Sequence, residues 1–215
     1  GHGGLVLLEA ESGGGKSRLL AEFALRATQQ GAMILRGQGL DQAAQRPFQL
    51  LTGVAEGLNT AARLESDLEQ RLRDGLGDHL EAACAVLPEL AKLFGAKIGG
   101  LGPETFAETR SVQALAALLD TIGTLNRPVV IMLDDCQWAD QLTLKVLNTW
   151  QRRSSNADRS LLVVVAYRSE EVLDGHPLRA FHSLAHLSLP AFAAANVRKL
   201  VESMAGPLPD AAVAV

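Results

Sequence analysis

The stretch AESGGGKS, residues Ala10 to Ser17, follows an apolar run and precedes a helical pattern. Its three glycines let backbone N–H groups turn toward a bound anion with no side chain in the way. The helix that follows would present its unpaired N–H groups and the positive end of its dipole to the same anion. Lys16 adds a full positive charge, and the Ser17 hydroxyl is a suitable ligand for Mg²⁺. The stretch therefore predicts a phosphate-binding loop between a strand and a helix.

The loop departs at one position from the usual pattern, G-x-x-x-x-G-K-[ST], because Ala10 replaces the first glycine. If position 10 requires a positive φ angle, alanine there costs about 1–2 kcal/mol; otherwise the replacement is harmless. The alternative interpretation of the stretch is a glycine-rich surface turn that caps a helix. On the first interpretation, the residues expected to bind the nucleotide are Ser12, Gly13, Gly14, Gly15, Lys16, Ser17 and Arg18.

Five segments of the chain predict strands. Three apolar runs without polar alternation are typical of strands buried on both faces, namely Leu5–Glu9, Pro128–Leu133 and Leu161–Tyr167. Ala32–Arg36 is a shorter fourth candidate, and His186–Leu189 is the weakest. Helical patterns lie between them, and strands that alternate with helices form parallel sheets with right-handed crossovers. The sequence therefore predicts an α/β fold built on a parallel sheet.

Apolar residues at helical spacing predict a helix over residues 16–30, with Gly31 as the residue that terminates it. A second pattern of this kind covers residues 112–122. Asp140 is a candidate cap for a third helix.

Residues 40–103 contain only helical patterns and predict a helical insertion at one edge of the sheet, after the second strand. Within the insertion we expect helices over residues 48–57, 62–72 and 80–93. Pro88 should break or kink the last of these.

Two acids end the predicted strand in PVVIMLDDCQWAD, residues Pro128 to Asp140. The carboxyl edge of an open parallel sheet is where ligands bind, so Asp134 and Asp135 would face the phosphate loop. Asp134 would hold Mg²⁺, and Asp135 would orient or deprotonate an attacking water. The alternative is a pair of solvated acids at the end of a strand.

Arg168 leaves another predicted strand at the same edge, in LLVVVAYRSEE. A guanidinium matches phosphate oxygens well, so this arginine could sense or stabilise a γ-phosphate. The alternative is an ordinary surface arginine that pairs with Glu170 or Glu171.

Composition excludes several classes of protein. The 215 residues, 47 % hydrophobic and 20 % charged, suit one globular domain. A net charge of −4 gives no basic field for nucleic acid, and no apolar run approaches the roughly 20 residues of a membrane helix. Two cysteines are too few for a disulfide framework, which favours a cytoplasmic location. The abrupt start and end suggest a piece of a longer protein.

These segments together resemble the ATPase domain of the STAND class of P-loop NTPases. More narrowly, they are similar to the AAA-type ATPase modules fused to bacterial regulators, such as large LuxR-type transcription activators, serine/threonine kinases and nucleotide cyclases. The string Asp-Asp-x-x-Trp-Ala-Asp, which begins at Asp134, is the most specific part of the resemblance. RPFQLLTGVAEGL, AVLPELAKL, HPLRAF and LSLPAFAAANVRKLV also resemble segments of that family.

The resemblance implies a five-stranded parallel sheet in the order 5-1-4-3-2, flanked by helices. It implies a P-loop core over residues 1–190, with the insertion at about 40–103, and the start of a truncated helical lid over 191–215. The implied ligands are ATP or ADP with Mg²⁺, and the implied activity is slow ATP hydrolysis used as a conformational switch. The implied partners are an effector domain elsewhere in a longer chain and a nucleotide-dependent oligomer, with no membrane and no nucleic acid bound by this segment.

The leading hypothesis is therefore a regulatory ATPase in which Lys16, Asp135 and Arg168 are catalytic and Ser17 and Asp134 hold the metal. The first alternative is a switch or scaffold that binds nucleotide without significant hydrolysis. A small-molecule kinase would share the phosphate loop, but the sequence has no signature of an acceptor site.

Overall fold

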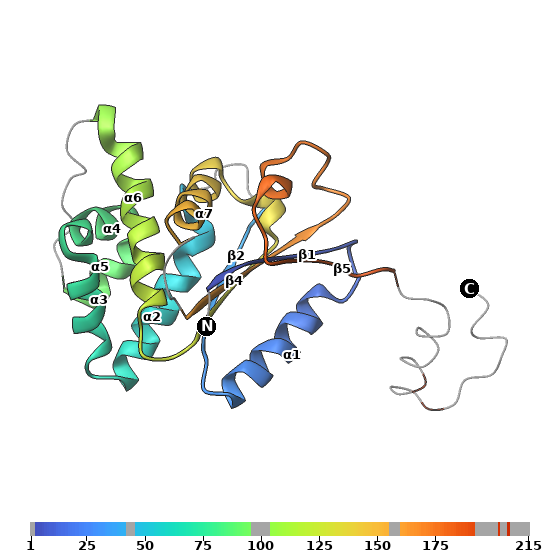
Figure 1. The fold of residues 1–215 in the computed structure, drawn as a ribbon, viewed down its shortest axis with the longest axis horizontal. Coiled ribbons are helices and arrows are strands. Elements are labelled where there is room, and N and C mark those ends of the chain that lie inside the picture. The colour runs from blue at the N-terminus through green and yellow to red at the C-terminus, as the bar shows by residue number, and fades with distance from the viewer. Residues whose placement is uncertain are drawn as a thin grey trace.

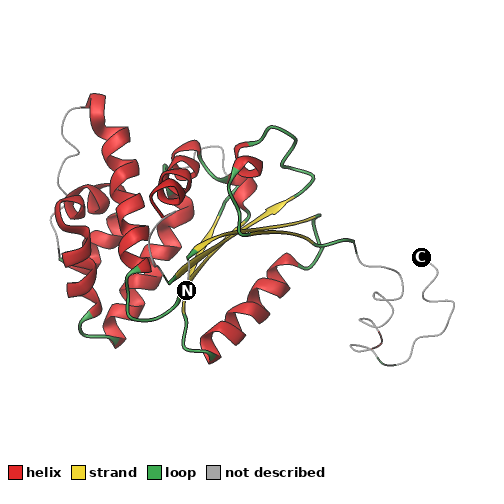
Figure 2. Ribbon diagram, in the orientation of Figure 1, coloured by secondary structure: helices red, strands yellow, loops and turns green. Residues whose placement is uncertain are grey.

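A five-stranded parallel sheet forms the centre of the computed structural model, which describes residues 3–41, 46–95, 104–154, 160–191, 202 and 206 (Figures 1 and 2). The strands are β1 (Gly4–Ala10), β2 (Met33–Gln38), β3 (Val129–Asp134), β4 (Leu161–Arg168) and β5 (Ala185–Ser188). Their order across the sheet is β2-β3-β4-β1-β5, which confirms the predicted order 5-1-4-3-2.

The register brings three strand ends to one edge of the sheet. Ala10 at the end of β1 lies opposite Arg168 at the end of β4. Asp134 at the end of β3 lies opposite Gln38 of β2, and Leu133 lies opposite Val165 of β4. The carboxyl ends of β1, β3 and β4 therefore meet where the predicted site residues begin.

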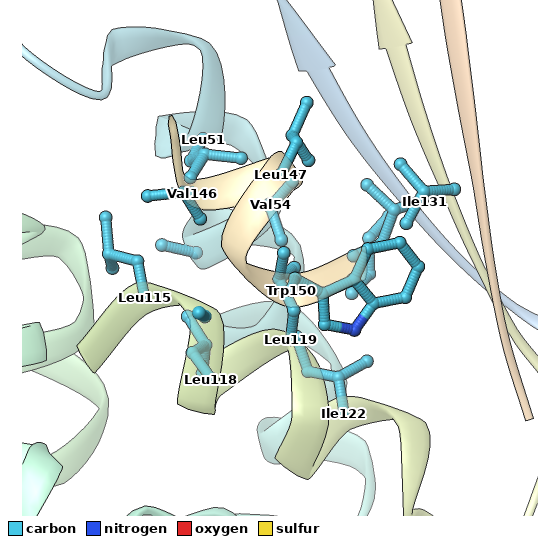
Figure 3. Packing of buried hydrophobic residues seen from close by; sticks show 14 of the residues in the cluster. Leu51, Val54, Leu115, Leu118, Leu119, Ile122, Ile131, Val146, Leu147 and Trp150 are labelled. Carbon is cyan, nitrogen blue, oxygen red and sulfur yellow. The ribbon is translucent and has the colours of Figure 1, made fainter. Parts of the chain in front are cut away.

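Helices cover the two faces of the sheet unequally. They are α1 (Lys16–Gln29), α2 (Thr52–Leu64), α3 (Leu68–Leu76), α4 (Leu80–Val86), α5 (Pro88–Phe94), α6 (Glu104–Gly123) and α7 (Gln141–Ser154). Helix α1 covers one face, where a small apolar cluster forms around Leu20, and the other helices lie on the opposite side (Figure 1). On that side Trp150 of α7 packs among Leu119 and Ile122 of α6 and Ile131 of β3 (Figure 3).

Most helix boundaries follow the expected signals. Helix α1 begins at Lys16 as predicted, and Gly31 adopts φ 86° just after it ends. The Asp140 carboxylate accepts a hydrogen bond of 3.0 Å from the Thr143 N–H and so caps α7. Pro88 interrupts the predicted helix over 80–93, because α4 ends at Val86 and α5 begins at the proline.

Two helix predictions in the insertion are wrong. The predicted helix over 62–72 is divided, since α2 ends at Leu64, Glu65 is extended, and α3 starts at Leu68. Helix α2 packs on β2 and α3 packs on α6, so each helix has its own apolar face. The apolar spacing therefore continues across the break. The helix predicted from Phe48 starts later, because Phe48 has φ 61° and a short 3₁₀ helix, η1 (Gln49–Leu51), precedes α2.

The predicted lid over residues 191–215 lies outside the described residues except for 191, 202 and 206, so the domain limits stay predictions. Among the described residues, no helix has the length and apolar character that crossing a bilayer would require.

Close contact between α2 and β2 covers the edge of the sheet. A Cβ atom added at Gly53 would lie 2.5 Å from the Arg36 carbonyl oxygen, and one added at Gly57 would lie 2.8 Å from the Leu35 Cδ2 atom. The glycines thus let the helix lie directly on the edge strand, which would otherwise offer unpaired backbone groups.

We expect Gly53→Ala to lower the free energy of unfolding by about 1–3 kcal/mol, because the new methyl group meets a backbone oxygen that cannot move alone. Gly57→Ala is the matched control, since its nearest neighbour is the end of a leucine side chain rather than a backbone atom. Urea denaturation of the two variants measures the difference. Without the close contact, alanine would keep or raise the stability, since it forms helices better than glycine does. Equal or increased stability of Gly53→Ala would therefore contradict the contact.

Candidate functional site

The glycine loop joins β1 to α1 and requires glycine at its turns. Gly13 and Gly15 have φ angles of 73° and 87°, in the region that favours glycine, and Gly15 directly precedes the first turn of α1. A Cβ atom at Gly14 would lie 2.9 Å from the Ala10 Cβ and 3.0 Å from the Glu11 carbonyl oxygen. The loop is therefore tightly turned, and a side chain at position 14 would collide with residues of the loop itself.

Ala10 causes no backbone strain. It is the last residue of β1, it is buried, and it pairs with Arg168 in the sheet. In the described part of the chain, Phe48 and Asp135 alone among the non-glycine residues have positive φ angles. Position 10 therefore does not require a positive φ angle, and alanine in place of the first glycine costs no backbone strain.

Lys16 lies inside the loop rather than in solvent. Its ammonium donates hydrogen bonds of 2.8 Å to the Ala10 carbonyl and 3.0 Å to the Glu11 carbonyl, and the residue is 7 % exposed. These two carbonyls compensate the charge of a nearly buried cation. The cation is thereby held at the N-terminus of α1, beside the backbone N–H groups of the loop.

Ser17 and Asp134 meet across the edge of the sheet. The Ser17 hydroxyl donates to Asp134 Oδ2 at 3.2 Å, and Asp134 Oδ1 accepts from the Asp135 N–H at 2.9 Å. A hydroxyl and a carboxylate are the hard oxygen donors that Mg²⁺ prefers, so the pair fits this ion. Among the described residues, no group of three or more His, Cys, Asp or Glu is arranged to hold a metal ion, so a metal held here would take its remaining ligands from water and phosphate.

The Asp135 carboxylate is held by three side chains. Gln38 Nε2 donates to Oδ2 at 3.2 Å, Gln137 Nε2 donates to Oδ1 at 3.1 Å, and Arg168 Nε lies 3.5 Å from Oδ1. The residue itself has a left-handed backbone, with φ 52° and ψ 40°. The carboxylate is thus connected to the last residue of β2 and the last residue of β4.

Arg168 has partners that the sequence indicated as alternatives. Its Nη1 donates to Glu171 Oε1 at 2.9 Å, and its guanidinium lies 4.9 Å from the centre of the Trp138 ring. The neighbouring Glu170 accepts a hydrogen bond of 2.7 Å from the Ser12 N–H of the loop. Arg168 therefore pairs both with Glu171, as the surface interpretation expects, and with Asp135.

All the predicted site residues border one cavity of about 280 Å³. They are Ser12, Gly13, Gly14, Gly15, Lys16, Ser17, Arg18, Asp134, Asp135 and Arg168. A neighbouring cavity of about 590 Å³ shares Ser17 and Asp134 and extends toward β2 and α2. The structure thus brings together segments far apart in the sequence, with three cationic residues and two acids around one space.

Sequence reasoning missed the three side chains that surround Asp135 and Arg168. Gln38 follows no motif, so nothing in the sequence points to it. Gln137 and Trp138 lie within the Asp-Asp-x-x-Trp-Ala-Asp string, and that position was the available signal.

Cys136 is not a nucleophile in this site. Burial raises the pKa of its thiol well above the ordinary value, and the Asp134 carboxylate raises it further. A protonated, buried thiol has no reactivity toward phosphate or water.

A polar cluster surrounds Glu9, next to the start of the loop. The Glu9 carboxylate accepts from the Tyr167 hydroxyl at 3.0 Å and from Arg179 Nη1 at 3.2 Å, and His186 Nε2 lies 3.4 Å away. Burial raises the pKa of Glu9, but the Tyr167 hydrogen bond and the charges of His186 and Arg179 outweigh it, so the pKa lies below its ordinary value. Burial and the bond to Glu9 raise the pKa of Tyr167 to about 12. The cluster joins β1, β4 and β5 next to Ala10.

Comparison with known proteins agrees with this description. The family model described as "AAA ATPase domain" matches residues 1–164, more than half of the chain. No curated protein matches the sequence significantly.

Two solved structures are similar at low sequence identity. A chain of the E. coli MS115-1 HORMA:CdnC:Trip13 complex is 14 % identical, with a TM-score of 0.46, over 99 % of this chain and 57 % of that one. The bacterial conjugative coupling protein TrwBdeltaN70 is 13 % identical, with a TM-score of 0.35, over 81 % of this chain and 64 % of that one. The chain thus spans less than two thirds of either protein.

We expect Tyr167→Phe to lower the free energy of unfolding by about 1–2 kcal/mol near neutral pH, because the Glu9 carboxylate loses a hydrogen bond. Since the pKa of Glu9 is lowered on folding, its stabilisation is present above the ordinary pKa of 4.5 and is lost as the pH falls through the folded-state value. Urea denaturation from neutral pH to about pH 3 should show the deficit shrinking at the acid end. A deficit that is independent of pH would contradict the role of the Glu9 charge.

Proposed function

The chain belongs to the AAA ATPase domain family, and from this premise we propose that it is a regulatory ATPase domain that binds ATP with Mg²⁺ and hydrolyses it slowly. One observation carries the proposal: the residues of three distant segments border a single cavity, in which the Ser17 hydroxyl bonds to Asp134. The phosphates would lie on the glycine loop, at the N-terminus of α1.

Lys16 and the loop N–H groups would bind the β- and γ-phosphates. The ammonium is already held in the cavity by two carbonyls, so little conformational freedom remains to be lost when the phosphates arrive. Ser17 and Asp134 are the residues that would hold Mg²⁺, which when bound supplies neutralisation of phosphate charge. Ser12 and Arg18 border the cavity at its ends and would contact the nucleotide there.

Asp135 would orient the attacking water and accept its proton, and Arg168 would stabilise charge on the γ-phosphate. The 3.5 Å pairing of these two groups supports a slow reaction, because Arg168 must leave Asp135 before it can face a phosphate. Glu171 holds the same guanidinium at 2.9 Å and adds to that requirement.

A role as a switch is supported by hydrogen bonds that connect the loop to the segment between β4 and β5. Glu170 bonds to the loop at Ser12, and the chain after it brings Arg179 back to Glu9. A change at the phosphates would therefore reach the segment that leads into β5. Together with the resemblance to STAND-class regulators, this supports an effector elsewhere in a longer cytoplasmic protein and a nucleotide-dependent oligomer. The net charge of −4 supports the further proposal that this chain binds no nucleic acid.

We expect Lys16→Ala to weaken Mg·ATP binding ten- to a hundredfold, about the value of one or two charge-assisted contacts. Lys92→Ala is the matched control, because Lys92 is exposed on α5 and remote from the loop. Calorimetric titration of ATP, ADP and GTP, each with and without Mg²⁺, measures the affinities. An unchanged affinity of the Lys16 variant would count against nucleotide binding by this loop.

Asp135→Asn should lower steady phosphate release under excess ATP by at least about a hundredfold, because the amide cannot accept the proton of water. Asparagine tolerates the left-handed backbone of this position, so the fold is preserved. Asp74→Asn on the surface of α3 is the control. Wild-type protein that binds ATP without releasing phosphate would instead support the alternative, a nucleotide-binding switch without hydrolysis.

A further inference from the structure

We propose that Gln137 is a positioning residue for ATP hydrolysis, because its amide joins the Asp135 carboxylate to the backbone of Arg168. The inference rests on the proposed function, in which Asp135 acts on water and Arg168 acts on the terminal phosphate. It adds a residue for which that proposal has no role.

Gln137 uses both ends of its side chain. Its Nε2 donates to Asp135 Oδ1 at 3.1 Å, and its Oε1 accepts from the Arg168 N–H at 3.2 Å. A carboxylate only accepts hydrogen bonds and a backbone N–H only donates them, so the two partners determine the orientation of the amide. The side chain is thus a bridge from the loop after β3 to the end of β4.

Asp135 lies where the sheet no longer holds the chain. The pairing between β3 and β4 ends at Leu133 opposite Val165, two residues earlier. Asp135 then turns into a left-handed conformation, which is uncommon for a residue other than glycine. Its carboxylate is therefore placed by side-chain contacts, and Gln137 is the contact that connects it to the main chain of β4.

The bridge does not depend on the Arg168 guanidinium. That group is 30 % exposed and lies 3.5 Å from Asp135, which makes a weak pair. When the guanidinium turns toward a phosphate, its contact with Asp135 is lost. The Gln137 contact to the Arg168 backbone persists, so the acid and the arginine keep their relative position. An error of about 1 Å in such a position can cost a hundredfold in rate.

Trp138 makes the bridge observable. It follows Gln137 in a short 3₁₀ helix, η3 (Cys136–Trp138), and its ring lies 4.9 Å from the Arg168 guanidinium. The other tryptophan, Trp150, is fully buried. Quenching of tryptophan fluorescence by iodide therefore reports on Trp138 and on the packing of η3 against Arg168.

Gln137→Met keeps the length of the side chain and removes both hydrogen bonds. We expect kcat for ATP hydrolysis to fall about tenfold, the value of one to two hydrogen bonds at this site, while KM and Kd for Mg·ATP stay within about twofold. The matched control is Gln70→Met, which removes a glutamine–aspartate bond of 2.7 Å on the surface of α3 and should leave kcat unchanged. A kcat within twofold of wild type, or a Kd that rises in step with the loss of kcat, would overturn the proposal.

A double-mutant cycle separates positioning from general damage. If Gln137 acts through Asp135, adding Gln137→Met to Asp135→Asn lowers kcat by less than about twofold further. A second, independent tenfold loss overturns the proposal. If Gln137→Met does not fold, Gln137→Glu replaces it, because glutamate keeps the acceptor for the Arg168 N–H, loses the donation to Asp135 and repels that carboxylate.

Iodide quenching of the nucleotide-free protein distinguishes failure of the inference from failure of the proposed function. Gln137→Met should expose Trp138 to iodide more than the wild type does, whether or not ATP is hydrolysed. Absence of phosphate release from wild type refutes the proposed function, and unchanged quenching in the variant refutes the bridge.

Discussion

Parallel pairing in register is the constraint on which the site depends. Ala10 lies opposite Arg168 and Leu133 lies opposite Val165, so three strands end together at one edge of the sheet. Residues more than a hundred positions apart thereby come within hydrogen-bond distance, as Ser17 and Asp134 do at 3.2 Å. A slip of one residue in either pairing would turn a site side chain to the opposite face of the sheet. Both faces of the sheet are buried, so such a slip would expose apolar residues of the central strands and is therefore unfavourable.

The Lys16 and Arg168 cations at this edge both have partners, which makes the arrangement stable before any ligand arrives. Lys16 is compensated by two carbonyls of its own loop, and Arg168 by Asp135 and Glu171. The same pairing limits what the site can do, because a phosphate has to compete with these contacts. The Arg168 pairs are partly open to solvent, with side-chain exposures between 16 % and 33 %, so under the proposed function a triphosphate with its metal would displace them more readily than the contacts of the buried Lys16. The loop is therefore preorganised, whereas Arg168 can exchange its partners.

The loop, the acids and the segment after β4 form one connected polar network. Gln137 links Asp135 to β4, Glu170 links the segment after β4 to the loop, and Arg179 returns to Glu9 beneath it. Hydrogen bonds in such a chain depend on one another, because each fixes a group that the next one needs. Under the proposed function, a change at the phosphates would therefore have a physical route to β5.

The sequence by itself determined the fold class, the strand order implied by the resemblance, and the residues that border the cavity. Buried parallel strands are uninterrupted apolar runs, and a phosphate loop needs glycine, lysine and serine at set positions. It did not determine the break between α2 and α3, because apolar spacing continues across two helices that pack on different neighbours. Tertiary structure alone decided the partners of Arg168 and the places of Gln38 and Gln137. Those contacts join side chains at the ends of different strands. No periodic pattern in the sequence indicates which of these side chains will meet.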